Sequence, residues 1–320
     1  MAERKIVVAT HGHCFDGLVG AMLFTHLRRS LDSGPWRFKY FSCGYGPNMQ
    51  TVPEHWLRGD ENAIIDFRYS PSERLTWYFD HHPTGFASPE ERDAALGGTK
   101  RVFFDPSYDS CSRLVADVGR TRFGVDFSAF DELLGWTDRI DAARFDTVEQ
   151  ALDRSEPLMQ LASVVEQHGQ SPVMERLIER LLGEPAADVA RSDEVQALWL
   201  PLADMHRQAR ERVAQRAERH GAVVYVDLHD SPLGSSGKFF HYAVQPDAVY
   251  SVALVRMKQH LKLSLGYNPW ATEPRRHDIA ELCRRFGGGG HPEVGAVSFP
   301  LEKLEEARRI AKLLMDELNA

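Results

Sequence analysis

The sequence predicts an α/β protein whose first half is built on a largely parallel sheet. Short apolar runs that fit strands alternate with amphipathic stretches that fit helices, and this alternation is typical of parallel sheets. Polar residues directly follow several of the apolar runs, at the strand ends where such sheets gather their ligands. The predicted strands cover residues 6–9, 63–67, 75–79 and 101–104. Helices are expected at 18–31 and from near Asp109 onward.

The middle of the chain has the periodicity of helices. Residues 129–220 are expected to be mostly helical, because apolar residues between Val195 and Val213 keep spacings of three and four. Pro201 interrupts this pattern and predicts a kink or two separate helices. Gly221 predicts a helix end.

The last hundred residues return to strands. The predicted strands are AVVYVDL, FFHYAV, YSVALVR and LKLSLGY. A helix with Asp278 as its N-cap, a run of four glycines, a strand at 294–299 and a helix at 301–318 follow. We therefore predict a first α/β domain at 1–190, a helical linker at 191–221 and a smaller α/β domain at 222–320.

The composition is that of an ordinary globular protein. Of 320 residues, 43% are hydrophobic and 26% charged, and the net charge of −8 argues against sequence-independent binding to duplex DNA. The apolar run at 6–9 is too short for a signal sequence, and no apolar stretch approaches the roughly 18 residues of a membrane span. The four cysteines are scattered, which favours a reducing compartment. We expect a cytoplasmic protein without a membrane partner.

Acidic residues and histidines gather at the ends of successive predicted strands. They are found in HGHCFDG (11–17), at Asp66, in the triplet 80–82, and further on at Asp138 and Asp141. One such loop alone is most often a capped turn. Several carboxylates at neighbouring strand ends would repel one another, and a divalent metal relieves that repulsion. Oxygen and imidazole ligands suit Mn²⁺, Mg²⁺ or Zn²⁺, and a bridging carboxylate would fit a two-metal hydrolase.

The ordered set HGHCFDG, IIDF, FDHH, a later acidic motif and FGGGGHPEVGA resembles the DHH superfamily of phosphoesterases over essentially the whole chain. The glycine-rich motif is similar to the DHHA1 type of second domain. That domain accompanies RecJ-like nucleases, nanoRNases and cyclic-dinucleotide phosphodiesterases, and differs from the second domain of family II inorganic pyrophosphatases. The resemblance implies an N-terminal DHH catalytic domain and a C-terminal DHHA1-like substrate-binding domain.

The resemblance also implies roles for individual residues. His82 would face the scissile phosphate as a charge stabiliser or acid, and Asp80 would orient the pair of histidines. In the last motif the family has an aspartate followed four residues later by an aromatic; Asp141 with Phe145 fits this better than Asp138, which stays the second choice. The implied metal ligands, with Asp66 as the bridge, are His11, Asp16, Asp66, His81 and Asp141.

The first motif departs from the family at Cys14, where the first of two aspartates is expected. Cys14 can bind a metal as a thiolate or pack as a small apolar residue, and we include it among the ligands. Alternatively His13 substitutes, or one metal position is altered. A subgroup of DHH-like predicted phosphohydrolases resembles this chain in carrying the cysteine, so the change is not interpreted as loss of activity.

Substrate contacts are expected mainly in the second domain. Backbone N–H groups of a glycine run can hold a phosphate, whereas the simpler interpretation is a flexible turn. Arg113, at a predicted helix start, could bind a second phosphate, although plain capping explains that sequence equally well. Lys262 is a further candidate, and Tyr267 or Trp270 could stack on a base. The predicted substrate-binding residues are Gly288, Gly289, Gly290, His291 and Arg113.

Together these features predict a metal-dependent phosphohydrolase with two divalent ions, Mn²⁺ first, Mg²⁺ or Zn²⁺ as alternatives. The expected substrate is a short single-stranded oligonucleotide or a linear or cyclic dinucleotide. A polyphosphate or other phosphoanhydride hydrolase is the alternative enzyme. A catalytically silent nucleotide-binding protein is the alternative outside enzymes, and a homodimer stays open.

Overall fold

The computed structural model describes residues 3–44, 51–170, 172–230 and 239–320, and the chain divides into two compact units. Unit 1 comprises Met1–Arg144 and Arg154–Trp199, and unit 2 comprises Phe145–Asp153 and Leu200–Ala320. The chain thus passes into unit 2 twice, the second time within a helix, whereas the sequence suggested changes at 190 and 221.

Unit 1 contains a five-stranded sheet in the order β2-β1-β3-β4-β5, in which every pair of neighbours is parallel. The predicted parallel sheet is therefore confirmed. The strand order reverses between β1 and β3, and ligands of open parallel sheets bind at such a point. The strands are β1 (Arg4–His11), β2 (Trp36–Cys43), β3 (Glu61–Ile65), β4 (Trp77–Asp80) and β5 (Arg101–Phe104).

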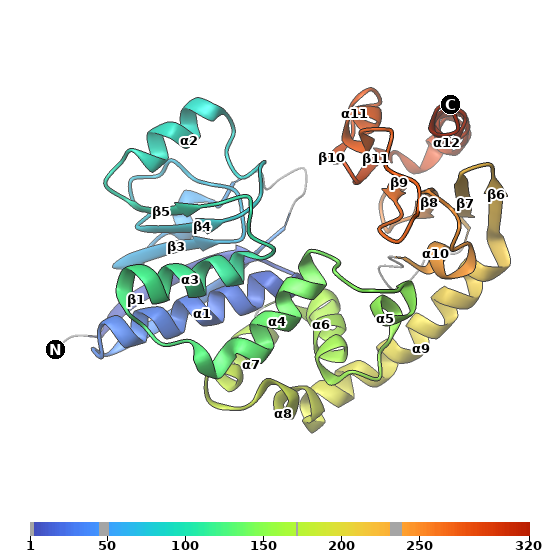
Figure 1. The fold of residues 1–320 in the computed structure, drawn as a ribbon. Helices are drawn as coiled ribbons and strands as arrows, with labels where there is room; N and C mark the ends of the chain where they lie inside the picture. Colours follow the sequence, from blue (N-terminus) through green and yellow to red (C-terminus); the bar gives the residue numbers. More distant parts are fainter. Residues whose placement is uncertain (1–2, 45–50, 171, 231–238) are drawn as a thin grey trace. The chain divides into compact units, whose positions relative to one another are not determined.

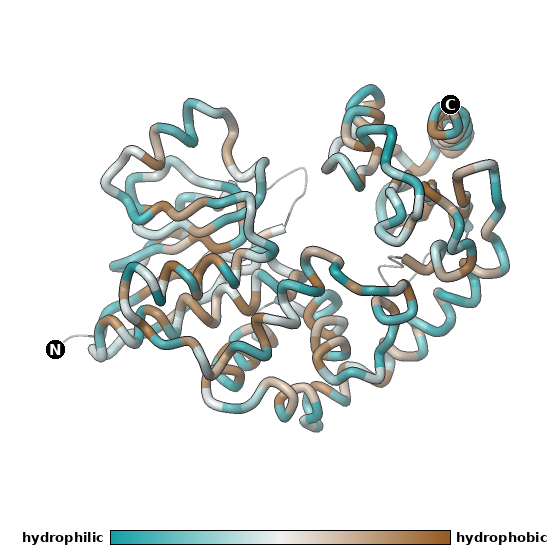
Figure 2. The backbone as a smooth tube through the Cα atoms, viewed as in Figure 1, coloured by the Kyte–Doolittle hydropathy of each residue, from teal (hydrophilic) through white to brown (hydrophobic). Residues whose placement is uncertain are grey.

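Helices α1 and α3 lie side by side along one face of this sheet (Figure 1). The strand residues 6–9 are fully buried, as expected for a parallel strand between neighbours. Figure 2 shows hydrophobic segments concentrated on the strands and on α1. The helices of unit 1 are α1 (Phe15–Leu31), α2 (Pro89–Leu96), α3 (Cys111–Phe123), α4 (Asp131–Asp141), α6 (Pro157–His168), α7 (Val173–Gly183) and α8 (Ala186–Arg191), with 3₁₀ turns η1 (Glu54–Trp56) and η2 (Ser128–Phe130).

Unit 2 contains a six-stranded sheet in the order β10-β11-β9-β8-β7-β6, antiparallel except for β7 and β8. The strands are β6 (Ala217–His220), β7 (Val223–Leu228), β8 (Tyr250–Arg256), β9 (Leu261–Tyr267), β10 (Gly289–His291) and β11 (Val294–Phe299). The helices that lie wholly in unit 2 are α5 (Val148–Leu152), α10 (Phe240–Val244), α11 (Ile279–Arg284) and α12 (Leu304–Leu318), with the turn η3 (Leu301–Lys303). Helix α9 (Asp193–Arg216) contains the boundary between the units.

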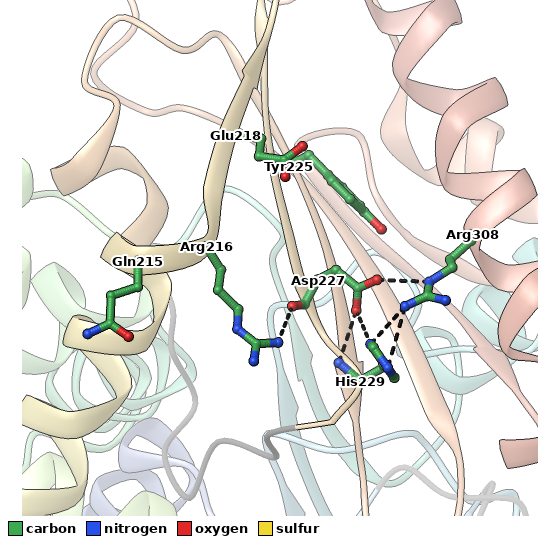
Figure 3. Close-up of a pocket in the computed structure, with 7 residues that line it drawn as sticks. All are labelled: Gln215, Arg216, Glu218, Tyr225, Asp227, His229 and Arg308. Atoms are coloured by element: carbon green, nitrogen blue, oxygen red, sulfur yellow. Dashed lines mark hydrogen bonds and ion pairs between the residues drawn. The ribbon is translucent and has the colours of Figure 1, made fainter.

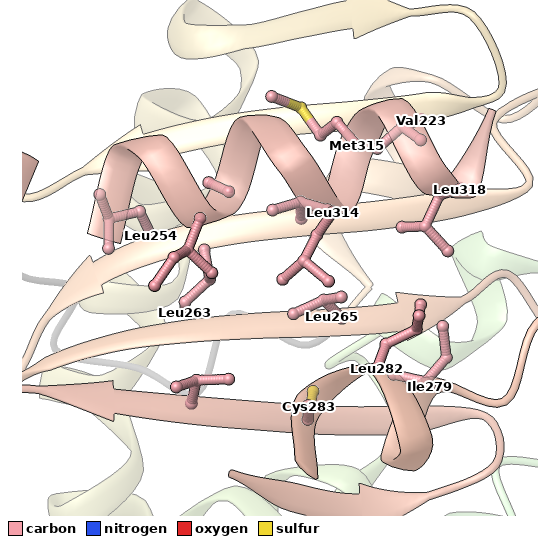
Figure 4. Packing of buried hydrophobic residues seen from close by; sticks show 14 of the residues in the cluster. Val223, Leu254, Leu263, Leu265, Ile279, Leu282, Cys283, Leu314, Met315 and Leu318 are labelled. Atoms are coloured by element: carbon pink, nitrogen blue, oxygen red, sulfur yellow. The ribbon is translucent and has the colours of Figure 1, made fainter. Parts of the chain in front are cut away.

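The main core of unit 2 lies between its sheet and two helices. Leu314 and Leu318 of α12 pack over strand residues such as Leu263 and Leu265, and α11 adds Leu282 (Figure 4). Full burial of a leucine side chain contributes about 1.5–3 kcal/mol. This core gives unit 2 a packed interior of its own.

Two sequence predictions in this region were wrong, and a third was wrong in one of its alternatives. FFHYAV forms helix α10, because Phe240 and Tyr242 face two separate hydrophobic clusters and the run is too short for its period to decide. The helix expected to reach Gly221 ends at Arg216, since 217–220 pair with β7 instead. Pro201 lies exposed inside α9, which continues through it as one helix, so the expectation of two separate helices is wrong. Among the described residues, no helix is long and apolar enough to cross a bilayer.

Candidate metal centre

The acidic and histidine side chains of unit 1 meet at the carboxyl ends of three adjacent strands. HGHCFDG follows β1, Asp66 follows β3, and Asp80 ends β4. The end of α4 brings Asp141 to the same place, where its Oδ2 lies 3.4 Å from His81 Nε2. The cluster therefore extends from the point between β1 and β3, where the strand order reverses, to the neighbouring end of β4.

A glycine lets the first motif fold tightly against β1. A Cβ atom on Gly17 would lie 2.2 Å from the carbonyl oxygen of His11, far inside van der Waals contact. Only a glycine allows α1 to begin this close to the end of β1. The DG pair of the motif thus positions Asp16 at the strand end.

Asp66 occupies the middle of the cluster. Its φ of 56° is left-handed, a conformation that aspartate tolerates better than most residues. Its side chain is 1% exposed, and neither carboxylate oxygen has a hydrogen-bond partner among the described residues. Oδ2 lies 3.5 Å from His11 Nδ1, while Oδ1 lies 3.4 Å from His82 Nδ1 and 3.8 Å from His81 Nε2. The two oxygens therefore face different groups of side chains.

His81 is held in one orientation by the backbone. Its Nδ1 lies 2.9 Å from the carbonyl oxygen of Tyr108, and a carbonyl can only accept, so Nδ1 carries the proton. Nε2 points at carboxylates and lies 3.8 Å from Asp16 Oδ2. Nε2 is buried and has no hydrogen-bond partner within the described chain. A histidine ligand to a metal is commonly held in this way, with one ring nitrogen bonded to a backbone carbonyl and the other presented to the metal.

Asp16 is buried, yet it is well supplied with donors. It accepts from the backbone N–H groups of Cys111 at 2.7 Å and Ser112 at 2.8 Å, at the start of α3, and also from the Ser112 hydroxyl. Even so, burial and then the neighbouring Asp66 raise the pKa of Asp16 from 3.8 to about 7, against the lowering effect of these hydrogen bonds. The negative charge of the cluster is thus only partly compensated by the protein.

The pKa of Asp141 is raised for the same reasons: burial first, then the charges of Asp16 and Asp66. Its side chain is 25% exposed, so water screens part of this repulsion. Such a concentration of carboxylates attracts a cation strongly.

Asp80 orients His82. It is fully buried and accepts from the Tyr78 hydroxyl at 2.9 Å, the His81 N–H at 3.0 Å and His82 Nδ1 at 2.9 Å. Burial opposes the positive charge of His82, but the bond to Asp80 and the charge of Asp66 outweigh it and raise the pKa of His82 to about 10. Asp80 and Asp66 thus favour the protonated form of the His82 ring.

Two residues of this arrangement escaped the sequence interpretation. Tyr78 holds Asp80 from two positions earlier on β4, where both side chains lie on the same face. A Cβ atom on Gly85 would lie 2.0 Å from Asp80 Oδ2. The spacing Tyr-x-Asp-x-x-x-x-Gly was the available signal, but it has meaning only once the turn after β4 is known.

Three overlapping groups of side chains could hold metal ions, with the ligand atoms of each group within 4.8 Å of one another. These are His11, Cys14 and Asp66; Asp66, His81 and His82; and Asp16, His81 and Asp141. The buried ligand atoms without hydrogen-bond partners and the raised pKa values of Asp16 and Asp141 fit a divalent cation.

His13 does not join these groups. Its Nδ1 lies 3.0 Å from the carbonyl oxygen of Glu166, and its Nε2 lies 2.8 Å from the side-chain nitrogen of Gln170. The residue has a φ of 56°, which directs it toward the end of α6. Of the two alternatives in the first motif, the structure places Cys14 in the cluster and His13 outside it.

Asp138 and Arg113 are engaged with each other. Arg113 Nε and Nη2 lie 2.9 and 2.7 Å from Asp138 Oδ2, and the Ser110 hydroxyl donates to Oδ1 at 2.6 Å. Ser110 also caps α3 by accepting from the Arg113 N–H. These residues form a structural link between α3 and α4, and neither belongs to a metal-binding group.

The glycine motif of unit 2 uses part of its backbone internally. The N–H of Gly287 donates to the Arg284 carbonyl at 3.1 Å and that of Gly288 to the Cys283 carbonyl at 3.0 Å, closing the end of α11. Gly289 and Gly290 continue into β10, the edge strand paired with β11. The side chain of His291 lies outside the described residues. Two of the four amides expected to hold phosphate are thus already bonded.

The other candidates in unit 2 also have structural partners. The Tyr267 hydroxyl donates to the Glu273 carbonyl at 2.9 Å, and Trp270 Nε1 donates to the Phe145 carbonyl at 2.7 Å. Both rings are partly exposed, so these bonds leave some of their surface open. Lys262 lies exposed on β9 opposite Ser298.

A pocket of about 320 Å³ lies elsewhere in unit 2, between the end of α9, strands β6 and β7, and α12 (Figure 3). Its charged side chains bind one another. Asp227 accepts from His229 Nδ1 at 2.7 Å and from Arg308 Nε at 3.0 Å, and Arg216 pairs with Asp230. This ion network satisfies its own members and does not have the character of a metal site.

No family model and no curated protein matches the sequence. Solved structures do match the fold. A pGpG-specific phosphodiesterase, PggH from Vibrio cholerae, superposes with a TM-score of 0.69 at 20% identity, covering 99% of each chain. A DHH domain from a member of a family of ribosomal proteins gives 0.67 at 13% identity, covering 99% of this chain and 88% of that one. RecJ from Thermus thermophilus in complex with Mn²⁺ gives 0.56 at 14% identity, covering 98% of this chain and 52% of that one.

These likenesses establish the architecture. The chain has the DHH type of fold, with a parallel-sheet unit followed by a mixed-sheet unit, as the resemblance of its motifs implied. The expected α/β class with a smaller second unit is thus confirmed.

Proposed function

We propose that this protein is a metal-dependent phosphodiesterase that hydrolyses short oligonucleotides or dinucleotides. The observation that carries the proposal is the buried carboxylate of Asp66. It lies between imidazole and carboxylate groups, and neither of its oxygens has a hydrogen-bond partner within the described chain. The similar structures support it, since one is named a pGpG-specific phosphodiesterase and others are RecJ proteins bound to Mn²⁺ or Mg²⁺.

Two divalent ions, Mn²⁺ first, would be held by His11, Cys14 and Asp66 on one side and by Asp16, His81 and Asp141 on the other. Asp66 would be shared, because its two oxygens face the two groups. Bound ions would supply Lewis acidity that activates water near neutral pH and polarises the phosphoryl oxygens.

The chain's own contribution is a positioned cation. His82 is fixed by Asp80, and the neighbouring carboxylates favour its protonated form, so it would donate a hydrogen bond to a phosphoryl oxygen as negative charge grows there. Donors of this kind typically contribute a factor of about 10²–10³ in turnover. Asp80 acts by holding the ring in place.

The test is product release from a panel of substrates with added Mn²⁺: a short oligoribonucleotide, linear and cyclic dinucleotides, polyphosphate and pyrophosphate. We expect mononucleotide release from the nucleotides, lost in Asp66→Asn. The matched control is Asp138→Asn, which removes a carboxylate of unit 1 outside the metal-binding groups. Release from polyphosphate alone would replace the proposal by a phosphoanhydride hydrolase. A folded protein that binds metal and nucleotides but releases nothing would replace it by a nucleotide-binding protein.

A further inference from the structure

The two outer groups of candidate ligands differ in their donor atoms. His11, Cys14 and Asp66 offer one nitrogen, one sulfur and one oxygen. Asp16, His81 and Asp141 offer one nitrogen and two oxygens. Thiolate is a soft ligand that favours Zn²⁺ and related ions, whereas carboxylates favour Mn²⁺ and Mg²⁺.

We infer that the two metal positions are chemically unequal: the Cys14 position selects a thiophilic ion such as Zn²⁺ or Co²⁺, and the Asp16 position a hard ion such as Mn²⁺ or Mg²⁺. The inference deepens the proposed function and rests on it, because it assigns different metals to the two halves of the same centre.

Cys14 differs from the other cysteines of the chain. Cys43, Cys111 and Cys283 are buried, and Cys111 Sγ lies 3.3 Å from the Phe79 carbonyl oxygen. Cys14 is partly exposed and stands directly before α1, at the strand end where the cluster forms. It is the cysteine whose sulfur shares a metal-binding group with histidine and carboxylate in the described chain.

The Cys14 sulfur lies among other ligand atoms. Its Sγ, a ring nitrogen of His11 and a carboxylate oxygen of Asp66 lie within 4.8 Å of one another. Ions with a high affinity for sulfur bind such a set best, which favours a thiophilic ion over Mg²⁺ at this position.

The arrangement of Asp66 fits two unlike positions. Oδ2 is on the side of His11, and Oδ1 is on the side of His81, with neither oxygen engaged in a hydrogen bond within the described residues. One carboxylate can therefore serve both positions while their remaining ligands differ.

His13, the alternative to Cys14 as a metal ligand, already has other partners. The ring nitrogens of His13 contact Glu166 and Gln170, so the sulfur of Cys14 is the ligand that the first motif directs into the cluster. The tight start of α1, with Gly17 against His11, keeps this sulfur at the strand end.

The experiment titrates the metal-free full-length protein with Co²⁺ and follows its absorption spectrum. A cobalt–thiolate bond gives a charge-transfer band in the near ultraviolet that oxygen and nitrogen ligands do not give. We expect this band with the first equivalent of Co²⁺. Cys14→Ser should abolish it and weaken Co²⁺ binding at the first position by about tenfold or more, since even indirect partners of a metal cost 10–100-fold when removed. Cys283→Ala, a buried cysteine of unit 2, is the control and should keep the band.

A second measurement exposes the metal-free protein to equal Zn²⁺ and Mn²⁺ and determines bound metal by elemental analysis. We expect about one of each per chain in the wild type, and a shift toward two Mn²⁺ in Cys14→Asp. Co²⁺ bound without a charge-transfer band, or equal metal content in wild type and Cys14→Asp, would overturn the inference while leaving the proposed function intact. A folded protein that binds no divalent metal at all would overturn both.

Discussion

Two polar clusters of similar composition behave in opposite ways in this molecule. In unit 1, Asp66 and His81 are buried with unpartnered ligand atoms within the described residues. In unit 2, Asp227, His229 and Arg308 bind one another at 2.7–3.1 Å. Both clusters combine carboxylates with histidine, and both lie beside strands.

The difference lies in what balances the negative charge. In unit 2 burial alone would raise the pKa of Asp227, but hydrogen bonds from His229 and then from the Arg308 guanidinium outweigh it and lower that pKa. In unit 1 no arginine or lysine forms an ion pair with Asp16, Asp66 or Asp141 among the described residues, and the pKa of Asp16 rises to about 7. Incomplete compensation, more than the number of acidic residues, therefore distinguishes a candidate metal centre from a structural network.

The sharpest way to test this distinction lies within α4. Asp141→Asn should lower turnover by more than about 100-fold, because it removes a proposed metal ligand, and outer partners of a metal alone are worth 10–100-fold. Asp138→Asn should leave turnover within a few-fold of wild type and instead lower the melting temperature, since it breaks the link to Arg113 and Ser110. Turnover and thermal melting of both variants decide the matter. The reverse pattern would make Asp138 the ligand.

Gly85→Ala tests how closely the surroundings of Asp80 are fitted. The added methyl would meet Asp80 Oδ2 and must displace it. Because His82 depends on Asp80 for its orientation, we expect a fall in kcat of about 10–100-fold. Bound metal, measured by elemental analysis, should stay unchanged. A variant with full kcat would show that Asp80 does not position His82.

The charge imbalance in unit 1 predicts an unusual dependence of stability on pH. The pKa of Asp16 is about 7 in the folded protein and about 3.8 in an unfolded chain, so the folded state binds more protons between these values. The unfolding free energy of the metal-free protein should therefore fall as pH rises from 4 to 7, by on the order of 2–4 kcal/mol.

Added Mn²⁺ should reverse this trend, because metal binding requires the deprotonated carboxylate and strengthens as pH rises. Denaturant unfolding at pH 5 and 7.5, with and without Mn²⁺, measures both effects. Equal stability of the metal-free protein at the two pH values would contradict the imbalance.

The smallest effect is expected in the balanced cluster. Arg308→Met keeps the aliphatic stem but removes the guanidinium from Asp227 and His229. Because the Arg308 side chain is 36% exposed, the loss of stability should be about 1 kcal/mol, and neither metal content nor turnover should change. Loss of turnover in this variant would place a functional site in unit 2 where we find a structural network.

The sequence predicted correctly that the polar residues directly after successive strands would cluster. Carboxylates after β1, β3 and β4 had to meet once the strands were neighbours, and the prediction of a cluster required little more. It could not choose between His13 and Cys14, because that choice depends on a left-handed backbone at His13 and a contact with Glu166, 153 residues away.

The same reason explains the other undecided residues. Asp138 and Asp141 lie three apart on α4, so periodicity places them on neighbouring parts of one helix face, and the partner that separates them is Arg113 on α3. Similarly, the glycine run does not reveal that the amides of Gly287 and Gly288 close the end of α11. Long-range partners decide such questions, and no local pattern encodes them.

The carboxylate of Asp16 accepts two backbone amides at the first turn of α3 and also faces the cluster. Any ion that draws charge from this carboxylate changes how firmly those amides are held. Hydrogen exchange at Cys111 and Ser112 would therefore respond to the state of the centre without any label or substrate. Hydrogen exchange at the start of α3, measured by mass spectrometry, would therefore report whether a metal is bound in the cluster of the unmodified protein.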